Sequence, residues 1–425
     1  MCGIFAAMTQ RGLAPERRDA ALKSLFHRGP DGNGSWTSSD RLWTLGHTRL
    51  SIIGLNNGSQ PMTSPDGAVH LVVNGEFYGY REIRDRLRAS GLSFATESDS
   101  EIALHLYQER GMQMPAELRG EFAIVIANER QRTMIGIRDR FGIKPLYYAV
   151  VNGDVFFASE IKALLAMGVP AKWDLEGATG GTGRCHESTE FAGIHTVPQG
   201  CYAIAKDGAV RIYPYWDWEI PTADEMKRNT RSEAEVIQDF RKALLDSVQQ
   251  RLVADVEVAS YLSGGIDSCA VLGLAQQGLS RPIRAFTLTF ENPLYDEAKI
   301  AEAQAKFVGA SYHPIPITGR EIADAYADAV WHSETQMFNG HGVAKYLLSR
   351  AVRDAGIKVV FTGEGADEML GGYPYFRVDA VNNNPGLSAA EKSVYINEML
   401  GANPATRALL MPEKVDSPEM QAIQR

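Results

Sequence analysis

The sequence predicts an α/β protein made of two differently built domains, and two patterns along its 425 residues carry this prediction. The first half holds short strand-like runs that turn back on themselves, together with two amphipathic helical segments, which indicates an antiparallel α/β sandwich. The second half alternates apolar strands with helical segments, which is the pattern of a parallel sheet with crossover helices. A chain of this length is long enough for two or three domains, each with its own core.

Turn signals delimit the elements of the first half. Both helical segments end at a glycine, and two of the strand-like runs are joined by an Asn-Gly turn at residues 152–153. The predicted helices are Tyr80–Ser90 and Asp99–Arg110, and the predicted strands are Val69–Val73, Glu121–Asn128, Thr133–Arg138, Leu146–Val151 and Val155–Ala158.

Two polar stretches separate the halves. Glu176–Glu190 is rich in glycine and polar residues and is expected to be a mobile loop, whereas Trp216–Arg231 is polar, interrupted by proline and typical of a domain linker. A long helix is predicted next. The predicted helices of the second half are Ser232–Leu252, Asp267–Gln277, Glu297–Val308 and Val343–Ala355, and its predicted strands are Val256–Leu262, Ile283–Phe290 and Ile357–Thr362.

The composition is that of an ordinary globular protein, with 44% hydrophobic and 22% charged residues. The formal net charge of −9 argues against nucleic acid as the main partner, because phosphate backbones bind basic surfaces. No apolar run approaches the ~18 residues that a membrane span needs, and a signal peptide pattern is absent, so we expect no membrane partner and a cytoplasmic location. Four cysteines are too few for a disulfide scaffold.

A glycine turn between a strand and a helix marks the first candidate site. The stretch YLSGGIDS, residues 261–268, places Gly264 and Gly265 where backbone N–H groups can close on a phosphate at a helix N-terminus. The serine hydroxyls add donors, and Asp267 would repel phosphate unless a cation lay between them, which points to a magnesium-bound nucleotide. The stretch is neither a Walker A loop nor a G-x-G-x-x-G fingerprint. The alternative is a tight connection without a ligand.

A second acidic turn follows the last predicted strand. The string TGEGADE, residues 362–368, carries three acids within five residues, interleaved with glycine. Because ligands of parallel sheets lie at the carboxyl ends of the strands, this turn and residues 261–268 are expected at one edge. The alternative is a solvated turn.

The N-terminus holds a candidate nucleophile. Removal of Met1 would give Cys2 a free α-amine beside its thiol, and an amine with a pKa of about 7.7–8.0 is a competent base for a thiol near neutral pH. The alternative is a buried cysteine without a catalytic role.

Five motifs resemble the class II glutamine amidotransferase domain of the asparagine synthetase family. They are MCGI at 1–4, HRGPDG at 27–32, HTRLSI at 47–52, NGEFY at 74–78 and SDSE at 98–101. The string SGGIDS resembles the pyrophosphate loop of ATP pyrophosphatases, and GEGADE resembles the second ATP motif of the same family. This resemblance implies an N-terminal αββα Ntn-hydrolase sandwich followed by an ATP-pyrophosphatase domain related to the adenine nucleotide alpha hydrolases.

The resemblance also implies a glutamine site. Arg49 would clamp the α-carboxylate of glutamine, and Glu76 and Asp99 would hold its ammonium. The amide of Asn74 and the N–H of Gly75 would form the oxyanion hole. The implied catalytic residues are Cys2, Asn74 and Gly75, and the implied substrate-binding residues are Arg49, Leu50, Ile52, Asn74, Glu76 and Asp99. Each has a structural alternative: a surface ion pair for Arg49, a hairpin turn for Asn74-Gly75, and a helix N-cap for Asp99.

For the second half the resemblance implies an adenylating site. Asp267 and Asp367 would hold Mg²⁺, and Glu364 would assist adenylation. The implied ATP-binding residues are Leu262, Ser263, Gly264, Gly265, Asp267, Ser268, Leu288 and Gly363. Two further stretches that resemble the family, residues 139–148 and 157–162, are expected to be structural and near the second half.

Together these expectations describe a glutamine-dependent ligase. Residues 1–215 would be the amidotransferase domain, 216–231 the linker, and 232–425 an ATP-binding domain that lacks the C-terminal part usual in the family. Glutamine hydrolysed at Cys2 would give ammonia for an acyl-adenylate, with aspartate converted to asparagine. The alternatives are a specialised carboxylate acceptor and a regulatory module without synthesis. The partners are glutamine, ATP and a small carboxylate, with a homodimer or a partner chain that completes the C-terminal part left open.

Overall fold

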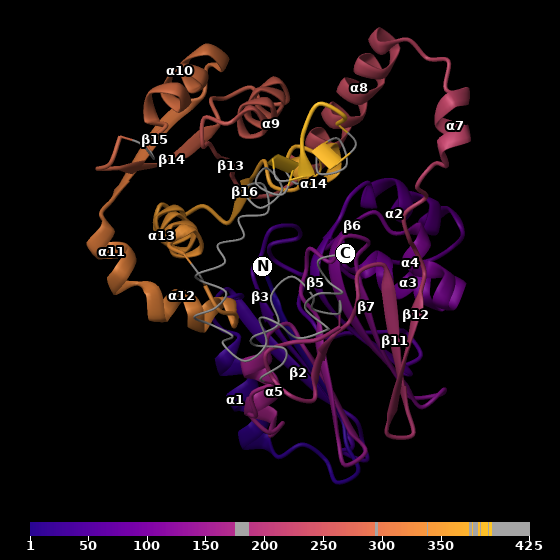
Figure 1. The fold of residues 1–425 in the computed structure, drawn as a ribbon. Helices are drawn as coiled ribbons and strands as arrows, with labels where there is room; N and C mark the ends of the chain where they lie inside the picture. Colours follow the sequence, from indigo (N-terminus) through magenta and orange to yellow (C-terminus); the bar gives the residue numbers. More distant parts are fainter. Residues whose placement is uncertain are drawn as a thin grey trace. The chain divides into compact units, whose positions relative to one another are not determined.

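The computed structural model describes residues 1–174, 187–293, 296–337, 339–373, 376, 381–382, 384–389 and 391–392 (Figure 1). Its contacts group the described residues into two compact units. The first unit comprises residues 1–174, 187–259 and 317–359 within these limits, and the second comprises 260–316 and the residues from 360 onwards. The domain boundary expected at 216–231 stays a prediction.

Two six-stranded sheets form the centre of the first unit, and every pairing in them is antiparallel. One sheet has the order β10-β8-β9-β1-β3-β2 and the other β12-β11-β7-β6-β5-β4. The strands of the first are β1 (Gly3–Met8), β2 (Gly32–Thr37), β3 (Trp43–Arg49), β8 (Tyr147–Val151), β9 (Asp154–Ala158) and β10 (Ile194–Thr196). Those of the second are β4 (Met62–Thr63), β5 (Val69–Phe77), β6 (Gly120–Asn128), β7 (Thr133–Arg138), β11 (Cys201–Lys206) and β12 (Ala209–Pro214).

Helices cover the outer faces of both sheets (Figure 1). The side chains of β1 alternate: Ile4 and Ala6 enter the core between the sheets, while Phe5 packs with the helices on the other face. These helices are α1 (Pro15–Ser24) and α5 (Ile161–Met167), and the second sheet is covered by α2 (Tyr80–Ala89) and α3 (Glu101–Arg110), with the short η1 (Gly111–Gln113) and α4 (Met114–Glu117) following. Three cores between four layers confirm the αββα sandwich.

The predicted elements of the first half are present with ends shifted by a few residues. One alternative proves wrong, because β5 continues through Asn74-Gly75 to Phe77 and no hairpin turn lies there. Helix α1 was not predicted from the sequence. Of its ten residues only Ala21 is buried, so the helix has no apolar stripe that could reveal it.

The first unit continues with helices from the second half of the chain. They are α7 (Ala223–Arg228), α8 (Glu233–Arg251), α11 (Gly319–Asp324), α12 (Tyr326–Ser333) and α13 (His341–Asp354). Helices α7 and α8 begin with capping boxes at Thr222 and Ser232, which explains why the polar linker sequence contains a helix.

The predicted loop at 176–190 lies mostly outside the described residues. Its end is packed, however, because Thr189 and Glu190 are buried. The Thr189 hydroxyl donates to the Ile194 carbonyl at 2.8 Å, and the Asp174 N–H donates to the Glu190 carbonyl at 2.8 Å. The expectation of a mobile loop is therefore wrong at this end, where local hydrogen bonds compensate for the polar composition.

A four-stranded sheet of order β15-β14-β13-β16 organises the second unit. Its strands are β13 (Val258–Tyr261), β14 (Arg284–Phe290), β15 (Ser311–Ile317) and β16 (Val359–Phe361), and its helices are α9 (Ile266–Gln277), α10 (Ala298–Val308) and α14 (Ala366–Leu370). Strands β13 and β14 are parallel, which confirms the predicted sheet type. Strand β15 was not predicted because it contains Pro314 and Pro316, which its position at the sheet edge tolerates.

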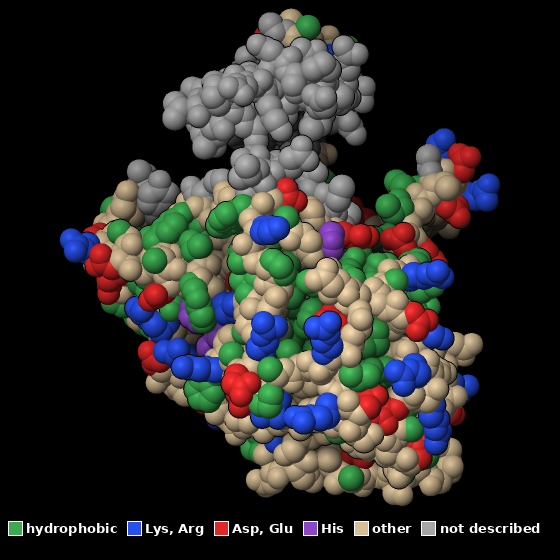
Figure 2. Space-filling view, turned by 90° about the horizontal axis from the view of Figure 1, so that it is seen from below, with side chains coloured by type: hydrophobic (Ala, Val, Ile, Leu, Met, Phe, Trp, Pro, Cys, Tyr) green, Lys and Arg blue, Asp and Glu red, His purple; other side chains and the backbone are tan. Residues whose placement is uncertain are grey.

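The surface carries both signs of charge. On the face shown in Figure 2, basic and acidic side chains are interspersed with apolar ones. Among the described residues, no helix is both long enough and apolar enough to cross a membrane.

One buried carboxylate organises the loop that links β7 and β8. Asp139 is fully buried and accepts backbone N–H bonds from Phe141 and Ile143 at Oδ1 and from Lys144 and Phe122 at Oδ2, at 3.0–3.2 Å. The loop has no regular secondary structure, so this carboxylate replaces the missing backbone partners. The structural role expected for this stretch is consistent with these contacts.

We expect Asp139→Asn to destabilise the first unit by roughly 2–4 kcal/mol, because the amide NH₂ would face N–H donors and leave some of them buried without acceptors. Asp207→Asn is the matched control, since Asp207 is exposed in the β11–β12 turn. Urea unfolding of the two variants measures the difference. Equal midpoints would contradict the role assigned to Asp139.

Candidate active site

The candidate nucleophile lies directly before β1. The Leu50 N–H donates to Cys2 Sγ at 3.4 Å, and the thiol points to the Leu50 carbonyl at 3.8 Å. Strand β3 ends one residue earlier and pairs with β1, with Gly3 opposite Thr48. Leu50, expected to contact glutamine, therefore contacts the thiol through its backbone.

Burial and the groups around Cys2 act in opposite directions on the pKa of its thiol. Burial raises the pKa of the thiol, while the nearby N-terminal ammonium, the Leu50 N–H and Arg28 lower it. Burial also lowers the pKa of the Met1 ammonium, to about 5. In a chain without Met1 the terminal amine would be that of Cys2, and an unprotonated amine there could accept the thiol proton.

The candidate oxyanion donors lie on β5. Asn74 is fully buried, and among the described residues neither its Oδ1 nor its Nδ2 has a hydrogen-bond partner. A Cβ on Gly75 would lie 2.2 Å from the Glu121 carbonyl oxygen and 2.6 Å from Phe122 Cα, so only glycine fits against β6. A buried amide without a partner costs free energy and suits a ligand that carries a polar group.

Two carboxylates flank this strand. Asp99 is buried and accepts the Phe77 N–H at 2.9 Å, which ties the turn before α3 to the end of β5. Burial raises the pKa of Asp99 to about 6, and burial together with the charge of Asp99 raises the pKa of Glu76 to about 7. Asp99 is not a helix N-cap, because α3 begins at Glu101 after Ser100.

The charges of these groups reach the thiol. The Asp99 carboxylate acts to raise the pKa of Cys2, and Glu76 acts to raise that of the N-terminal ammonium. Across the sheets, His47 Nε2 on β3 lies 3.2 Å from the Val73 carbonyl on β5. These contacts bring the ends of β1, β3 and β5 together at one site.

Arg49 is held by backbone oxygens. Its guanidinium donates to the carbonyls of Gly54 at 2.6 Å and of Ile53 and Leu55 at 3.3 Å. Among the described residues no carboxylate lies within ion-pair distance of Arg49, so the surface ion pair is wrong. An oriented guanidinium without a neutralising partner suits a carboxylate ligand.

The remaining predicted pocket residue, Ile52, is structural in part. Its side chain is half-buried against the core between the second sheet and its helices, and its carbonyl accepts the Asp255 N–H at 3.0 Å. Sequence reasoning assigned no role to Arg28, although its Nε donates to the Cys2 carbonyl at 2.9 Å. The HRGPDG motif was the signal, but its contact with Cys2 could not be read from spacing.

In the second unit, the SGGIDS loop is held by its own serines. The Ser263 and Ser268 hydroxyls lie 3.0 Å apart, the Gly265 N–H donates to Ser263 Oγ at 3.2 Å, and Ser268 Oγ donates to the Gly265 carbonyl at 3.0 Å. Gly264 has a φ of +90°, a conformation that favours glycine. Both hydroxyls thus support the loop between β13 and α9.

The two acidic turns of the second unit meet. A Cβ on Gly363 would lie 2.7 Å from the Ser268 N and 3.1 Å from Asp267 Cβ, so the end of β16 touches the start of α9. Gly372 lies directly against Asp367, because a Cβ placed on Gly372 would overlap the Asp367 carboxylate. The Gly372 N–H donates to the Asp367 carbonyl at 2.9 Å.

The other predicted residues differ in exposure. Leu262 is buried and donates its N–H to the Phe286 carbonyl at 2.9 Å, Leu288 is half-buried on β14, and Glu364 is exposed. Asp267 and Asp367 are half-buried. Within the described parts of the chain no cluster of three or more His, Cys, Asp or Glu side chains could hold a metal. Two carboxylates fit Mg²⁺ that arrives with nucleotide phosphates and keeps several waters.

Comparison with known proteins settles the family. Residues 1–216 match the glutamine amidotransferase domain and residues 239–421 match asparagine synthase. The chain belongs to the asparagine synthetase family. A probable glutamine-hydrolysing asparagine synthetase of Dictyostelium discoideum is 31% identical, with 96% of this chain and 72% of that protein covered.

Two fungal relatives are more similar. Amidase chyE of Penicillium rubens is 40% identical, and amidase chry2 of Gibberella zeae is 38% identical, each over 90% of this chain. The chain spans 60% and 61% of their lengths.

We expect glutamine binding to weaken as the pH falls. If Glu76 and Asp99 hold the substrate ammonium, both must be ionised, and their pKa values in the free protein are about 7 and about 6. Protonation of Glu76 alone makes binding about tenfold weaker at pH 6 than at pH 8. Calorimetric titration of glutamine into Cys2→Ala, which lacks the candidate nucleophile, measures this.

The matched control is Glu76→Gln, whose weaker binding should depend on pH only through Asp99, with a midpoint near 6. An affinity of Cys2→Ala that stays constant from pH 6 to 8 would show that these carboxylates do not hold the ammonium.

Proposed function

We propose that this protein hydrolyses glutamine at Cys2 and uses the ammonia on an acyl-adenylate that it makes from ATP and a carboxylate. The observation that carries the first half of this proposal is the buried Asn74 amide, which has no hydrogen-bond partner among the described residues. A buried amide donor that has no partner suits the oxygen of a tetrahedral intermediate. The family membership supports the second half.

At the glutamine site, removal of Met1 would free the α-amine of Cys2, which takes the thiol proton as Sγ attacks the carboxamide carbon. The Asn74 Nδ2 and Gly75 N–H stabilise the oxyanion. The ammonium so formed returns the proton to the leaving ammonia, and a thioester remains. Water then hydrolyses the thioester, with the amine as base, and glutamate leaves.

At the nucleotide site, an oxygen of the acceptor carboxylate attacks the α-phosphorus of ATP and pyrophosphate leaves. The backbone N–H groups of the first residues of α9, 266–268, would bind the departing phosphates. Mg²⁺ held by Asp267 and Asp367 would neutralise phosphate charge. Glu364 would assist adenylation, and ammonia would attack the acyl carbon to give the amide and AMP.

The acceptor has two candidates. Aspartate is favoured by the relatives named asparagine synthetases, and a different carboxylate is favoured by the more similar relatives, which are named amidases. A different candidate function, the third in all, is that of a glutaminase that has lost synthesis and uses no acceptor.

The test is AMP formation from ATP with glutamine or ammonia and a panel of carboxylates that includes aspartate. We expect Cys2→Ala to lose glutamine-dependent product and keep ammonia-dependent product, because the two sites share no catalytic group. Asp267→Asn should lose both products but retain glutamate formation. An acceptor-specific release of AMP identifies the carboxylate, whereas glutaminase without AMP from any acceptor would leave the third candidate.

We further expect Asn74→Ala to lower kcat of the glutaminase by about 10²–10³ without lowering the unfolding midpoint appreciably, because the amide makes no hydrogen bond with any described residue. Gln60→Ala is the control for stability, since buried Gln60 accepts the Val73 N–H at 2.6 Å and should destabilise the fold when removed. Steady-state kinetics and thermal unfolding measure the two effects. An Asn74→Ala variant with unchanged kcat would disprove the oxyanion role.

A further inference from the structure

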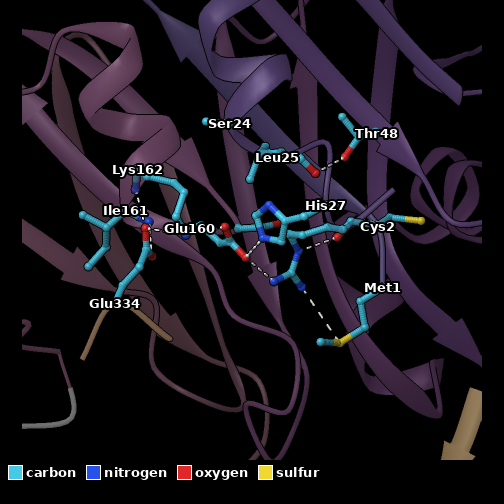
Figure 3. Close-up of polar contacts among 12 residues, drawn as sticks. Met1, Cys2, Ser24, Leu25, His27, Thr48, Glu160, Ile161, Lys162 and Glu334 are labelled. Carbon is cyan, nitrogen blue, oxygen red and sulfur yellow. Dashed lines mark hydrogen bonds and ion pairs between the residues drawn. The ribbon is translucent and has the colours of Figure 1, made fainter. Parts of the chain in front are cut away.

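A carboxylate from the asparagine synthase part of the sequence caps a helix of the amidotransferase part. Glu334 follows α12, and its two oxygens accept the N–H groups of Ile161 and Lys162 at 2.6 Å each, at the start of α5 (Figure 3). Its side chain is only 9% exposed. Glu334 also has a φ of +56°, which costs free energy for a residue other than glycine and persists where surrounding contacts fix it.

A chain of short polar contacts leads from Glu334 to the nucleophile. Lys162 Nζ lies 3.0 Å from Glu334 Oε1 and 2.7 Å from Glu160 Oε2. Glu160 Oε1 accepts from Arg28 Nη1 at 2.7 Å, and Arg28 Nε donates to the Cys2 carbonyl at 2.9 Å. Figure 3 shows Glu160 between Cys2 on one side and Lys162 with Glu334 on the other.

The charges in this chain of contacts balance. Two carboxylates, Glu160 and Glu334, face two cations, Arg28 and Lys162, and each side chain is at most 11% exposed. Burial acts to raise the pKa of Glu160, but a hydrogen bond from His27 and the charges of Arg28 and Lys162 lower it to about 2. Removal of one partner from such a buried set leaves a charge uncompensated and forces rearrangement.

Other contacts fix the end of α12 against the same place. The Thr335 hydroxyl donates to Glu190 Oε1 at 2.7 Å, and Lys162 Nζ lies 4.6 Å from the centre of the Trp331 ring. The Glu334 contacts therefore belong to an ordered junction, and they join residues matched by asparagine synthase to residues matched by the amidotransferase domain.

We propose that Glu334 is a positioning residue for the glutaminase, which holds Cys2 in place through Lys162, Glu160 and Arg28. This proposal rests on the proposed hydrolysis of glutamine at Cys2. Glu334 touches no reacting atom. It makes the geometry of the nucleophile depend on the segment at 317–359, so a displacement of that segment would reach Cys2 through the cap of α5.

The test compares Glu334→Gln with the wild-type chain. The amide NH₂ would face an N–H donor of α5, and Lys162 would lose one of its carboxylates. We expect glutaminase kcat to fall between about 10-fold and 100-fold, the range for a reacting group misplaced by up to ~1 Å. KM for glutamine should change less than twofold, because Arg49, Glu76 and Asp99 are untouched. Asp324→Asn, an exposed charge removal on α11, is the matched control and should leave both constants unchanged.

Two further measurements separate positioning from a general loss of structure. The first is the pH dependence of Cys2 alkylation by iodoacetamide. Its midpoint should shift upward in Glu334→Gln, because Arg28 lowers the pKa of the thiol and would relax away. The second is a double-mutant cycle with Arg28→Lys. If Glu334 acts through Arg28, the double variant should be within twofold of Arg28→Lys alone.

Each outcome decides the proposal. The proposal would be overturned if the losses of kcat from Glu334→Gln and Arg28→Lys multiplied in the double variant. It would also be overturned if Glu334→Gln left both kcat and the alkylation midpoint unchanged. Should Glu334→Gln fail to fold, Lys162→Gln keeps the backbone N–H bonds to Glu334 but removes the Nζ contacts with Glu334 and Glu160, and it carries the same expectation. A wild-type chain without glutaminase activity would defeat the proposed function, whereas the alkylation profile still tests the positioning, since iodoacetamide needs no glutamine site.

Discussion

The candidate glutamine site depends on the central position of β1 in its sheet. This strand pairs with β3 on one side and with β9 on the other, and its side chains enter two different cores. Because both edges of β1 are paired, Cys2 cannot shift along the sheet without breaking two ladders. A nucleophile at a chain terminus would ordinarily fray, and burial of the next strand in the middle of a sheet prevents this.

The site holds groups that one ligand would complete. Among the described residues Asn74 is buried without a hydrogen-bond partner and Arg49 has no carboxylate within ion-pair distance, and burial raises the pKa values of Glu76 and Asp99. Each feature costs free energy, and each would be relieved by one group of a single ligand: an oxygen, a carboxylate and an ammonium. A structural role accounts for the backbone contacts of Arg49 and Asp99, but not for the Asn74 amide or for the raised carboxylate pKa values.

The sequence could predict most of the regular elements because their hydrophobic periods are clear, as in Thr133–Arg138, whose bounds agree with the structure. It could not predict α1, whose packing uses few apolar residues, or β15, whose prolines are tolerated only at an edge. The motifs named the candidate site residues, whose roles stay predictions, but could not assign a role to Arg28. Its partner Glu160 lies 132 residues away, and no local pattern reveals such a pairing.

At the nucleotide site too, the sequence could not predict which partners the side chains have. The serines of SGGIDS were expected to donate to phosphate, yet in the structure their hydroxyls bond to one another and to the loop backbone. Composition alone could not distinguish these uses, since a hydroxyl can do either. A loop fixed by its own side chains loses little entropy when a phosphate binds, and it offers the start of α9 to the ligand. In both units, therefore, internal hydrogen bonds hold the backbone around the candidate site in place, and several candidate ligand groups, among them Arg49, Asp99 and the two serines, take part in that support.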